Sequence, residues 1–412
     1  MADSRLMLLR NAALVDASAR ERRTGIEVLI EDDTIREVSD RPIRSAGANI
    51  VDLGGRTLMP GLIDAHVHVI GVTTDLAALA RIPPYLVAAQ AKGILEGMLA
   101  RGFTTARDAG GAEWSIAEAV RRGHFRGPRL YVAGLALAQT GGQGDVRTRV
   151  EDELGCPCCN AMRSLCRVVD GVDEVRKAVR DELRKGADHI KVMASGGMVS
   201  RVPIHQAHYA VAELETMVEE ATAAGTYVMA HAYESYAIRR CVEAGVHSIE
   251  HGNLIDDATA KLMAERGTYM VPTMTVYEGY YRHGADLGFA PNVTARFAEL
   301  GKMAVTGLDR VHSAGVKIGH GSDLEGILHP YQSREFALKA QVMSPWEVIV
   351  AATATNAEML GLKGKIGIVA PGALADLIVV DGDPLANLNL LAGQGEHLSL
   401  IMQAGIIYKN RL

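Results

Sequence analysis

The stretch Met59-Pro60-Gly61-Leu62-Ile63-Asp64-Ala65-His66-Val67-His68 ends an apolar run with two histidines that are two positions apart. In a β-strand alternate side chains leave the same face, so His66 and His68 would point to the same side. Two imidazoles directed at one point from a rigid strand end can supply half of a metal site. The alternative is two histidines on a half-exposed strand, and the rest of the chain decides between the two interpretations.

The overall composition is that of a globular protein with a large core. Of the 412 residues, 48% are hydrophobic and 22% are charged. The net charge is −6 and no basic run occurs, which argues against a nucleic-acid partner. No stretch reaches the roughly 18 uncharged apolar residues of a membrane span, and the N-terminal residues contain no signal-peptide apolar region. We therefore expect a soluble, cytoplasmic protein without a membrane association.

Strand patterns with turn signals between them mark both ends of the chain. The strands expected there are Leu6–Leu9, Gly25–Ile30, Ile35–Val38, Ile50–Leu53, Gly364–Gly367, Asp376–Asp381 and Leu398–Ile407. The simplest closure joins the two ends, residues 1–57 and 361–412, in one β-sandwich domain.

Between the two ends, apolar strand candidates alternate with amphipathic helix candidates. The expected strands are Leu62–Val69, Thr104–Asp108, Leu130–Ala133, Ile190–Ala194, Tyr227–His231, Ser248–Glu250, Tyr269–Val271 and Lys317–His320. The helix candidates include Val172–Lys185, Ala212–Ala224, Tyr236–Ala244 and Asp257–Arg266. Such an alternation predicts an α/β fold in which residues 58–360 form a (β/α)8 barrel.

The active sites of such barrels lie at the carboxyl ends of the strands. The residues expected there are His66, His68, Lys191, His231, His251 and Asp323. Each has a simpler explanation when it is taken alone. A lysine in an apolar strand can extend to the surface, and an aspartate after Gly-Ser can cap a helix. Six such residues at the correct strand ends together favour a metal centre.

The lysine suggests which kind of metal centre this is. A protonated ammonium group cannot lie beside divalent cations, but a lysine that has added carbon dioxide becomes a carbamate, which can bridge two metals. Lys191 is the candidate for this modification. The first metal would be held by His66, His68 and Asp323, and the second by His231 and His251.

These ligands predict the metal and its chemistry. Imidazole and carboxylate ligands suit zinc, with manganese, iron or cobalt as alternatives. Two metals that share a water lower its pKa and produce a bridging hydroxide at neutral pH. Asp323 can then take its proton and pass it to a leaving nitrogen.

These residues also resemble a known family over essentially the whole chain. The order Gly61–His68, Lys191, His231, His251 and Ser322-Asp323 is similar to that of the amidohydrolase superfamily, as is the C-terminal stretch Gly372–Pro384. The segments Ile190–Gly197, Ala230–Tyr233 and Ile249–Asp256 resemble a narrower branch. That branch contains Xaa-Pro dipeptidases (prolidases), carboxypeptidases that release Arg or Lys, and amidohydrolases that cleave ochratoxin A.

The resemblance implies hydrolysis of an amide whose nitrogen belongs to a C-terminal amino acid. The substrate would be an Xaa-Pro dipeptide or an N-acyl amino acid, with an ochratoxin-type N-acyl-phenylalanine or an Xaa-Arg/Lys peptide as alternatives. A cyclic-amide hydrolase of the imidazolone type is more distant, because that class more often uses one metal without the lysine. A barrel kept as an assembly scaffold would lack ligands, and none is missing. The resemblance also implies a homo-oligomer.

Further residues of the site follow from the same resemblance. Tyr233 would donate a hydrogen bond to the developing oxyanion. Gln143 stands where relatives have the histidine of a Gly-Gly-His segment, and an amide can donate a hydrogen bond but cannot become cationic.

Arginine forks suit a substrate carboxylate, although surface solvation is the commoner role of an arginine. The candidates are Arg147, Arg149 and Arg201. His205 and His208 could face the substrate, and His320 could contact the site from behind the ligands.

The five cysteines do not form the pattern of a secreted disulfide framework. Cys156, Cys158, Cys159 and Cys166 crowd into one segment without the paired Cys-x-x-Cys spacing of a structural zinc site. We expect a reduced cluster that packs a long loop, with a structural zinc as the alternative.

Overall fold

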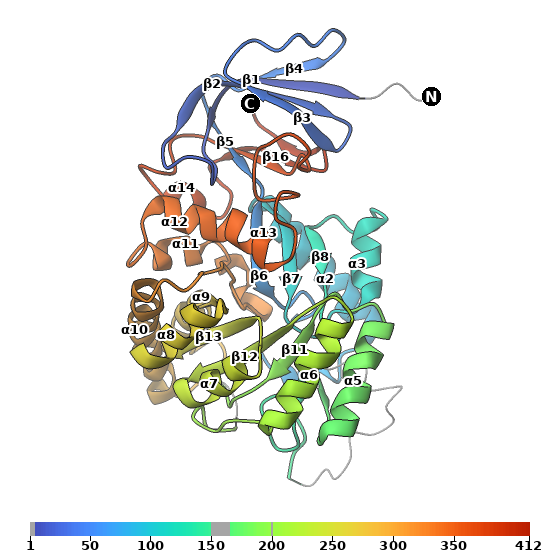
Figure 1. The fold of residues 1–412 in the computed structure, drawn as a ribbon, viewed down its shortest axis with the longest axis vertical. Helices are drawn as coiled ribbons and strands as arrows, with labels where there is room; N and C mark the ends of the chain where they lie inside the picture. Colours follow the sequence, from blue (N-terminus) through green and yellow to red (C-terminus); the bar gives the residue numbers. More distant parts are fainter. Residues whose placement is uncertain (1–4, 150–164, 199–200) are drawn as a thin grey trace.

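The computed structural model describes residues 5–149, 165–198 and 201–412. Both ends of the chain lie in one outer sheet of eight strands, at the top of Figure 1, with the order β17-β16-β15-β5-β1-β2-β3 and β4 beside β1. Its strands are β1 (Leu6–Leu14), β2 (Arg23–Glu31), β3 (Thr34–Ser39), β4 (Asn49–Asp52), β5 (Thr57–Pro60), β15 (Leu377–Val380), β16 (Leu398–Gln403) and β17 (Ile406–Asn410).

The antiparallel pair of β5 and β15 joins the two ends of the chain, with Met59 opposite Ile378. Apolar side chains from both ends, including Leu9, Leu58 and Leu377, form one buried cluster on this sheet. The expected pairing of the two ends is therefore present, as a single sheet. The strand expected at Gly364–Gly367 is wrong, because the only pairing there is an isolated bridge between Lys363 and Ile366.

The inner strands form two parallel sheets, β6-β7-β8 and β10-β9-β11-β12-β13-β14. Their bounds are β6 (Leu62–Val67), β7 (Phe103–Asp108), β8 (Arg129–Tyr131), β9 (Ala136–Ala138), β10 (Cys166–Val168), β11 (Ile190–Met193), β12 (Val228–Glu234), β13 (Ser248–Leu254) and β14 (Tyr269–Val271). Seven of these strands lie at or close to expected positions. The other two, β9 and β10, fall between Ala133 and Ile190, where no strand was expected.

Hydrogen bonds cross the two gaps between the inner sheets without forming a regular ladder. Asp188 N–H donates to Val132 O at 2.8 Å, and Ala65 N–H donates to His320 O at 2.8 Å. The expected strand Lys317–His320 is reduced to one bridge, between Ile318 and Met270. The described strands are therefore arranged in a ring order, but they do not register as one continuous barrel ladder.

Helices connect the inner strands and pack outside them, as Figure 1 shows for α5, α6 and α7. Their bounds are α1 (Leu76–Leu79), α2 (Pro84–Ala100), α3 (Trp114–Arg121), α5 (Val172–Arg184), α6 (Val211–Ala223), α7 (Ser235–Glu243), α8 (Asp257–Arg266), α9 (Thr275–His283), α10 (Pro291–Ser313), η1 (Gly326–Tyr331), α11 (Arg334–Lys339), α12 (Pro345–Val350), η2 (Ala351–Thr355), α13 (Asn356–Met359) and α14 (Asn389–Ala392). In the described part of the chain, none of these helices is long and apolar enough for a membrane span.

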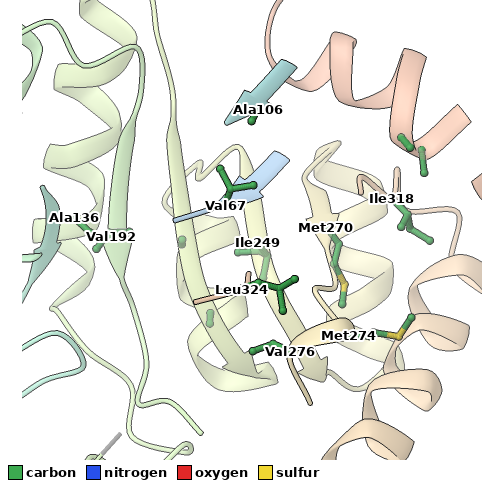
Figure 2. Packing of buried hydrophobic residues seen from close by; sticks show 14 of the residues in the cluster. Val67, Ala106, Ala136, Val192, Ile249, Met270, Met274, Val276, Ile318 and Leu324 are labelled. Atoms are coloured by element: carbon green, nitrogen blue, oxygen red, sulfur yellow. The ribbon is translucent and has the colours of Figure 1, made fainter. Parts of the chain in front are cut away.

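The inner strands and helices share one large apolar core. Figure 2 shows part of it, with Val67 of β6, Ile249 of β13 and Met270 of β14 in the same buried cluster. Burial of such side chains contributes roughly 1.5–3 kcal/mol each. The tight packing fixes the strand ends, and the polar residues that follow those strands are therefore held rigidly.

Candidate metal centre

The carboxyl ends of the inner strands bring three ligand candidates together. His66 comes from β6 and His251 from β13, while Asp323 follows the segment that bridges β14 and β6. One donor atom of each lies within 4.8 Å of the donors of the other two. His66 Nε2 and His68 Nε2 each lie 3.2 Å from Asp323 Oδ1.

Burial and charge set the electrostatics of this cluster. Burial opposes charge on the Asp323 carboxyl, but the imidazoles of His66 and His68 beside it hold its pKa well below the usual range. Burial lowers the pKa of His251 as well. The imidazole of His251 is therefore neutral and the carboxylate of Asp323 is charged, which are the forms that bind metals.

Lys191 and His231 lie on the other side of the cluster. His231 packs its ring 4.6 Å from the ring of His251, and burial lowers its pKa to about 3. Lys191, on β11, is fully buried, and burial lowers the pKa of its amine. Its amine makes no ion pair with any described residue. The six predicted ligands thus come from strand ends that face one cavity.

Partners that the sequence did not reveal orient the histidines. His66 Nδ1 lies 2.7 Å from Glu250 Oε2, and the other oxygen of Glu250 accepts a hydrogen bond from Arg107 at 2.8 Å. His251 Nδ1 lies 2.7 Å from the Thr273 hydroxyl. Such contacts fix the ring orientation of metal-binding histidines. The available sequence signal was a charged residue inside a buried strand, as at Arg107.

Backbone strain concentrates at the same residues. His251, Thr273 and Asp323 have φ angles of 72°, 47° and 54°, in the left-handed region that non-glycine residues rarely adopt. Strain of this kind persists only where the surroundings impose it, and it clusters at functional sites. We read it here as the result of directing these side chains at one point.

Tyr233, on β12, lies beside the cluster. Its ring stacks on that of His251, with 4.9 Å between the centroids and 9° between the planes. Burial raises the pKa of its phenol above the usual value, so the group remains a hydrogen-bond donor at neutral pH. It lines the cavity.

The cavity above the cluster has a volume of about 440 Å³, which is enough for a small molecule. Its wall includes Gln143 and Arg201, both predicted from the sequence. Gln143 packs against Gly197, where a Cβ would lie 2.9 Å from its amide carbon. The wall also includes Glu325, which was not predicted.

Other predicted substrate contacts do not reach this wall. The guanidinium of Arg147 pairs with Asp145 at 2.7 Å. His205 is exposed, and His320 is buried against Phe336 with 4.4 Å between ring centroids. None of these three predicted contacts lines the cavity, because loop paths and core packing direct them elsewhere.

The remaining candidates have local explanations or cannot be placed. Arg149 is exposed, and His208 Nδ1 lies 3.3 Å from the carbonyl of Met193. Cys166 is buried on β10, while Cys156, Cys158 and Cys159 lie outside the described residues.

The residues present fit a bound metal. His66 Nε2 is a buried nitrogen without a hydrogen-bond partner among the described residues. It faces Asp323 and His68, and its other nitrogen is already occupied by Glu250. A buried polar atom without a hydrogen bond is energetically unfavourable, and a metal ion bound to it would remove this cost. Imidazole and carboxylate donors are those that zinc and related metals accept.

The fold and this cluster define a class of protein, and comparison with known proteins agrees. Residues 57–406 match the model of the Amidohydrolase family. The ochratoxinase of Aspergillus niger is 32% identical over 366 residues, covering 85% of this chain and 75% of the relative. A solved amidohydrolase structure is 48% identical, with a TM-score of 0.95, and covers 99% of this chain and 100% of that chain.

A prolidase structure in complex with N-methylphosphonate-L-proline is 43% identical, with a TM-score of 0.95, and covers 98% of this chain and 100% of that chain. The chain belongs to the amidohydrolase family, and the resemblance noted in the sequence is confirmed. It is a hydrolase of a family that generally uses metal ions.

Proposed function

We propose that this hydrolase cleaves the amide bond to a C-terminal amino acid, with Xaa-Pro dipeptides as the first candidate substrates and N-acyl amino acids as the second. The observation that carries the proposal is the donor cluster of His66, His251 and Asp323 at the base of a cavity of about 440 Å³. The similar prolidase with its proline phosphonate supports a proline leaving group.

In this proposal two divalent metals, zinc first, are held by the predicted ligands: His66, His68 and Asp323 for one, and His231 and His251 for the other. When bound, they would polarise the amide carbonyl and lower the pKa of a water. Lys191 would bridge them as a carbamate.

The burial of Lys191 supports the carbamate. A lowered pKa leaves more of the amine neutral, and only the neutral amine attacks carbon dioxide. The new bond joins Nζ to the carbon of CO2, and one proton leaves Nζ. The product carries one negative charge where the neutral amine carried none; counted from the ammonium form, two protons are lost in all and the charge changes from +1 to −1. An ammonium group of Lys191, which would repel bound metal ions, is thereby replaced by an anionic group that can bind them.

The chain's own groups then take the remaining roles. Asp323 accepts a proton beside the cluster and delivers it to the leaving nitrogen. Tyr233 and Gln143 direct hydrogen bonds at the carbonyl oxygen. Arg201, in the cavity wall, faces the carboxylate of the leaving amino acid.

The alternatives differ in substrate. The ochratoxinase relative supports an N-acyl-phenylalanine, and an Xaa-Arg/Lys peptide would need an acidic group at the leaving end of the cavity. An imidazolone-type cyclic amide fits less well, because that class more often lacks a lysine at the position of Lys191.

The domain organisation extends this proposal. We take residues 58–360 as a (β/α)8 barrel that carries the site, with residues 1–57 and 361–412 as a separate β-sandwich domain. A homo-oligomer is expected by resemblance, and light scattering on the purified chain would measure its size.

A release assay on metal-analysed protein tests the function. It compares Xaa-Pro and Xaa-Arg dipeptides, N-acyl-prolines and an N-aroyl-phenylalanine. Preference for proline with about two metals per chain supports the proposal, and preference for the N-aroyl-phenylalanine supports the ochratoxinase-type alternative. One metal per chain without hydrolysis of any amide contradicts both.

A further inference from the structure

The cavity wall carries one carboxylate for which the proposed hydrolysis has no role. Glu325 lies two residues after Asp323 and lines the cavity. Its Oε2 lies 3.5 Å from the Tyr280 hydroxyl, and it forms no ion pair with a lysine or arginine of the described chain. A carboxylate placed beside the ligand Asp323 without a lysine or arginine partner is electrostatically costly, so its presence needs an explanation.

The other acidic residues of the wall are already engaged. Asp75 caps helix α1 by accepting from Ala78 N–H at 3.0 Å. Asp145 pairs with Arg147 at 2.7 Å. Of the described wall carboxylates outside the ligand cluster, Glu325 is therefore the one that neither pairs with an arginine nor caps a helix.

The cationic residue of the wall enters from the opposite side of the ring. Arg201 lies in the loop after β11, whereas Glu325 follows the segment 317–320. The strands β12, β13 and β14 separate the two on one side, and β6, β7, β8 and β9 on the other. The six ligand candidates line the same cavity. A ligand that lies across the cluster would meet a negative group at one end and a positive group at the other.

The rest of the wall contains apolar side chains. Val276 of α9, together with Leu287 and Phe289, lines the same cavity. These uncharged side chains suit an apolar side chain of a ligand, because burial of its apolar surface against them is favourable.

We propose that Glu325 binds the α-ammonium of the N-terminal residue of a dipeptide, so that the cavity selects zwitterionic dipeptides over N-acyl amino acids. The inference rests on the proposed amide hydrolysis and names its substrate class. The spacing agrees, since the ammonium of a dipeptide is two bonds from the carbonyl carbon that is attacked. The Cα atoms of Glu325 and Asp323 are at most about 7 Å apart.

The experiment compares two substrates that differ only in the ammonium group: Phe-Pro and 3-phenylpropanoyl-proline. Metal-loaded wild type should cleave Phe-Pro with the higher kcat/KM. In Glu325→Gln the kcat/KM for Phe-Pro should fall roughly ten- to a hundredfold, because a hydrogen bond from the ammonium to a carboxylate is replaced by one to a neutral amide. The kcat/KM of the same variant for 3-phenylpropanoyl-proline should fall by less than about threefold, because this substrate has no ammonium group. The control is Asp75→Asn, which keeps the helix cap and removes another charge of the cavity wall. It should leave the ratio of kcat/KM for Phe-Pro to kcat/KM for 3-phenylpropanoyl-proline unchanged.

Product inhibition gives a second readout, one of binding. Phenylalanine should inhibit the wild type more strongly than 3-phenylpropanoate does, and Glu325→Gln should remove this difference. If Glu325→Gln loses kcat/KM equally on both substrates, or keeps the wild-type ratio of the two values, the assignment of Glu325 is wrong. The proposed amide hydrolysis is unaffected by that result. Failure of wild type to cleave either substrate or any other amide overturns the proposed function and the inference together.

Discussion

Glu250 Oε2 lies 2.7 Å from His66 Nδ1, and Glu250 Oε1 lies 2.8 Å from the guanidinium of Arg107. All three side chains are fully buried. Arg107 and His66 hold the pKa of the Glu250 carboxyl at about 2 against the effect of burial, so it remains charged. The carboxylate thus fixes the imidazole with its free nitrogen, Nε2, directed at Asp323.

Glu250→Gln should therefore weaken metal binding as well as stability. The amide cannot offset the charge of Arg107, and loss of one partner of a buried pair costs about 3–5 kcal/mol. Metal affinity should fall roughly 10- to 100-fold. Titration with a competing chelator measures the affinity. Glu243→Gln, at an exposed position of α7, is the control and should retain full affinity.

Lys191→Ala should lose bound metal and activity together, because the variant cannot form the proposed bridging carbamate. Elemental analysis and the release assay on the same sample check this. We expect at least a hundredfold loss of activity, on the order of one removed catalytic interaction. A variant that retains both full metal content and full activity would exclude the carbamate.

Gln143→His should raise the turnover of acyl-proline substrates by roughly tenfold, since a charged donor makes a stronger hydrogen bond to the carbonyl than an amide does. The side chain lies in the cavity wall beside Gly197, so the site itself is altered. Steady-state kinetics measures the change. Unchanged kcat and KM would place the loop outside the site.

Stability should fall between pH 6.5 and 4 because of His329. Burial, with the charges of Arg101 and His68, lowers the pKa of His329 from 6.5 to about 4, although a hydrogen bond to Gly71 O opposes the shift. Below pH 6.5 the unfolded chain binds a proton that the folded chain excludes, so folding loses up to roughly 3 kcal/mol by pH 4.

Urea unfolding of His329→Gln against wild type isolates this contribution. Glutamine can still donate a hydrogen bond to Gly71 but does not titrate, so the variant should lose less stability on acidification. His124→Gln, at an exposed position, is the control and should follow the wild-type profile.

Gly61→Ala should destabilise the fold by about 1–3 kcal/mol, as overpacking does. A Cβ at Gly61 would overlap the hydroxyl of Thr104 on the neighbouring strand β7. Thr104→Ala removes the hydroxyl and the methyl group, which are the two nearest atoms in conflict, but it keeps the Cβ at 2.8 Å, so the double variant should recover part of the loss. Thermal unfolding of the single and double variants completes the cycle, and equal losses in both would contradict this account.

Local patterns were sufficient for most elements of the fold. Strands such as β14 and β15 are short apolar runs. Helices such as α8 show helical apolar spacing with Asp256 as a cap and Gly267 after the last turn. The segments Lys317–His320 and Gly364–Gly367 were harder to predict. Strand pairing there depends on distant partners that a local pattern does not contain.

The sequence alone determined the metal-ligand candidates, because His66, Lys191, His251 and Asp323 each follow or interrupt a recognisable strand, and parallel strands end at one edge. Only the tertiary structure decided which other side chains meet them. The contact of Glu250 with Arg107 spans 143 positions, and Arg201 enters the cavity across the ring from Glu325. Such relationships depend on the relative placement of whole strands and loops, which is set by packing of the complete core and is absent from any short stretch of sequence.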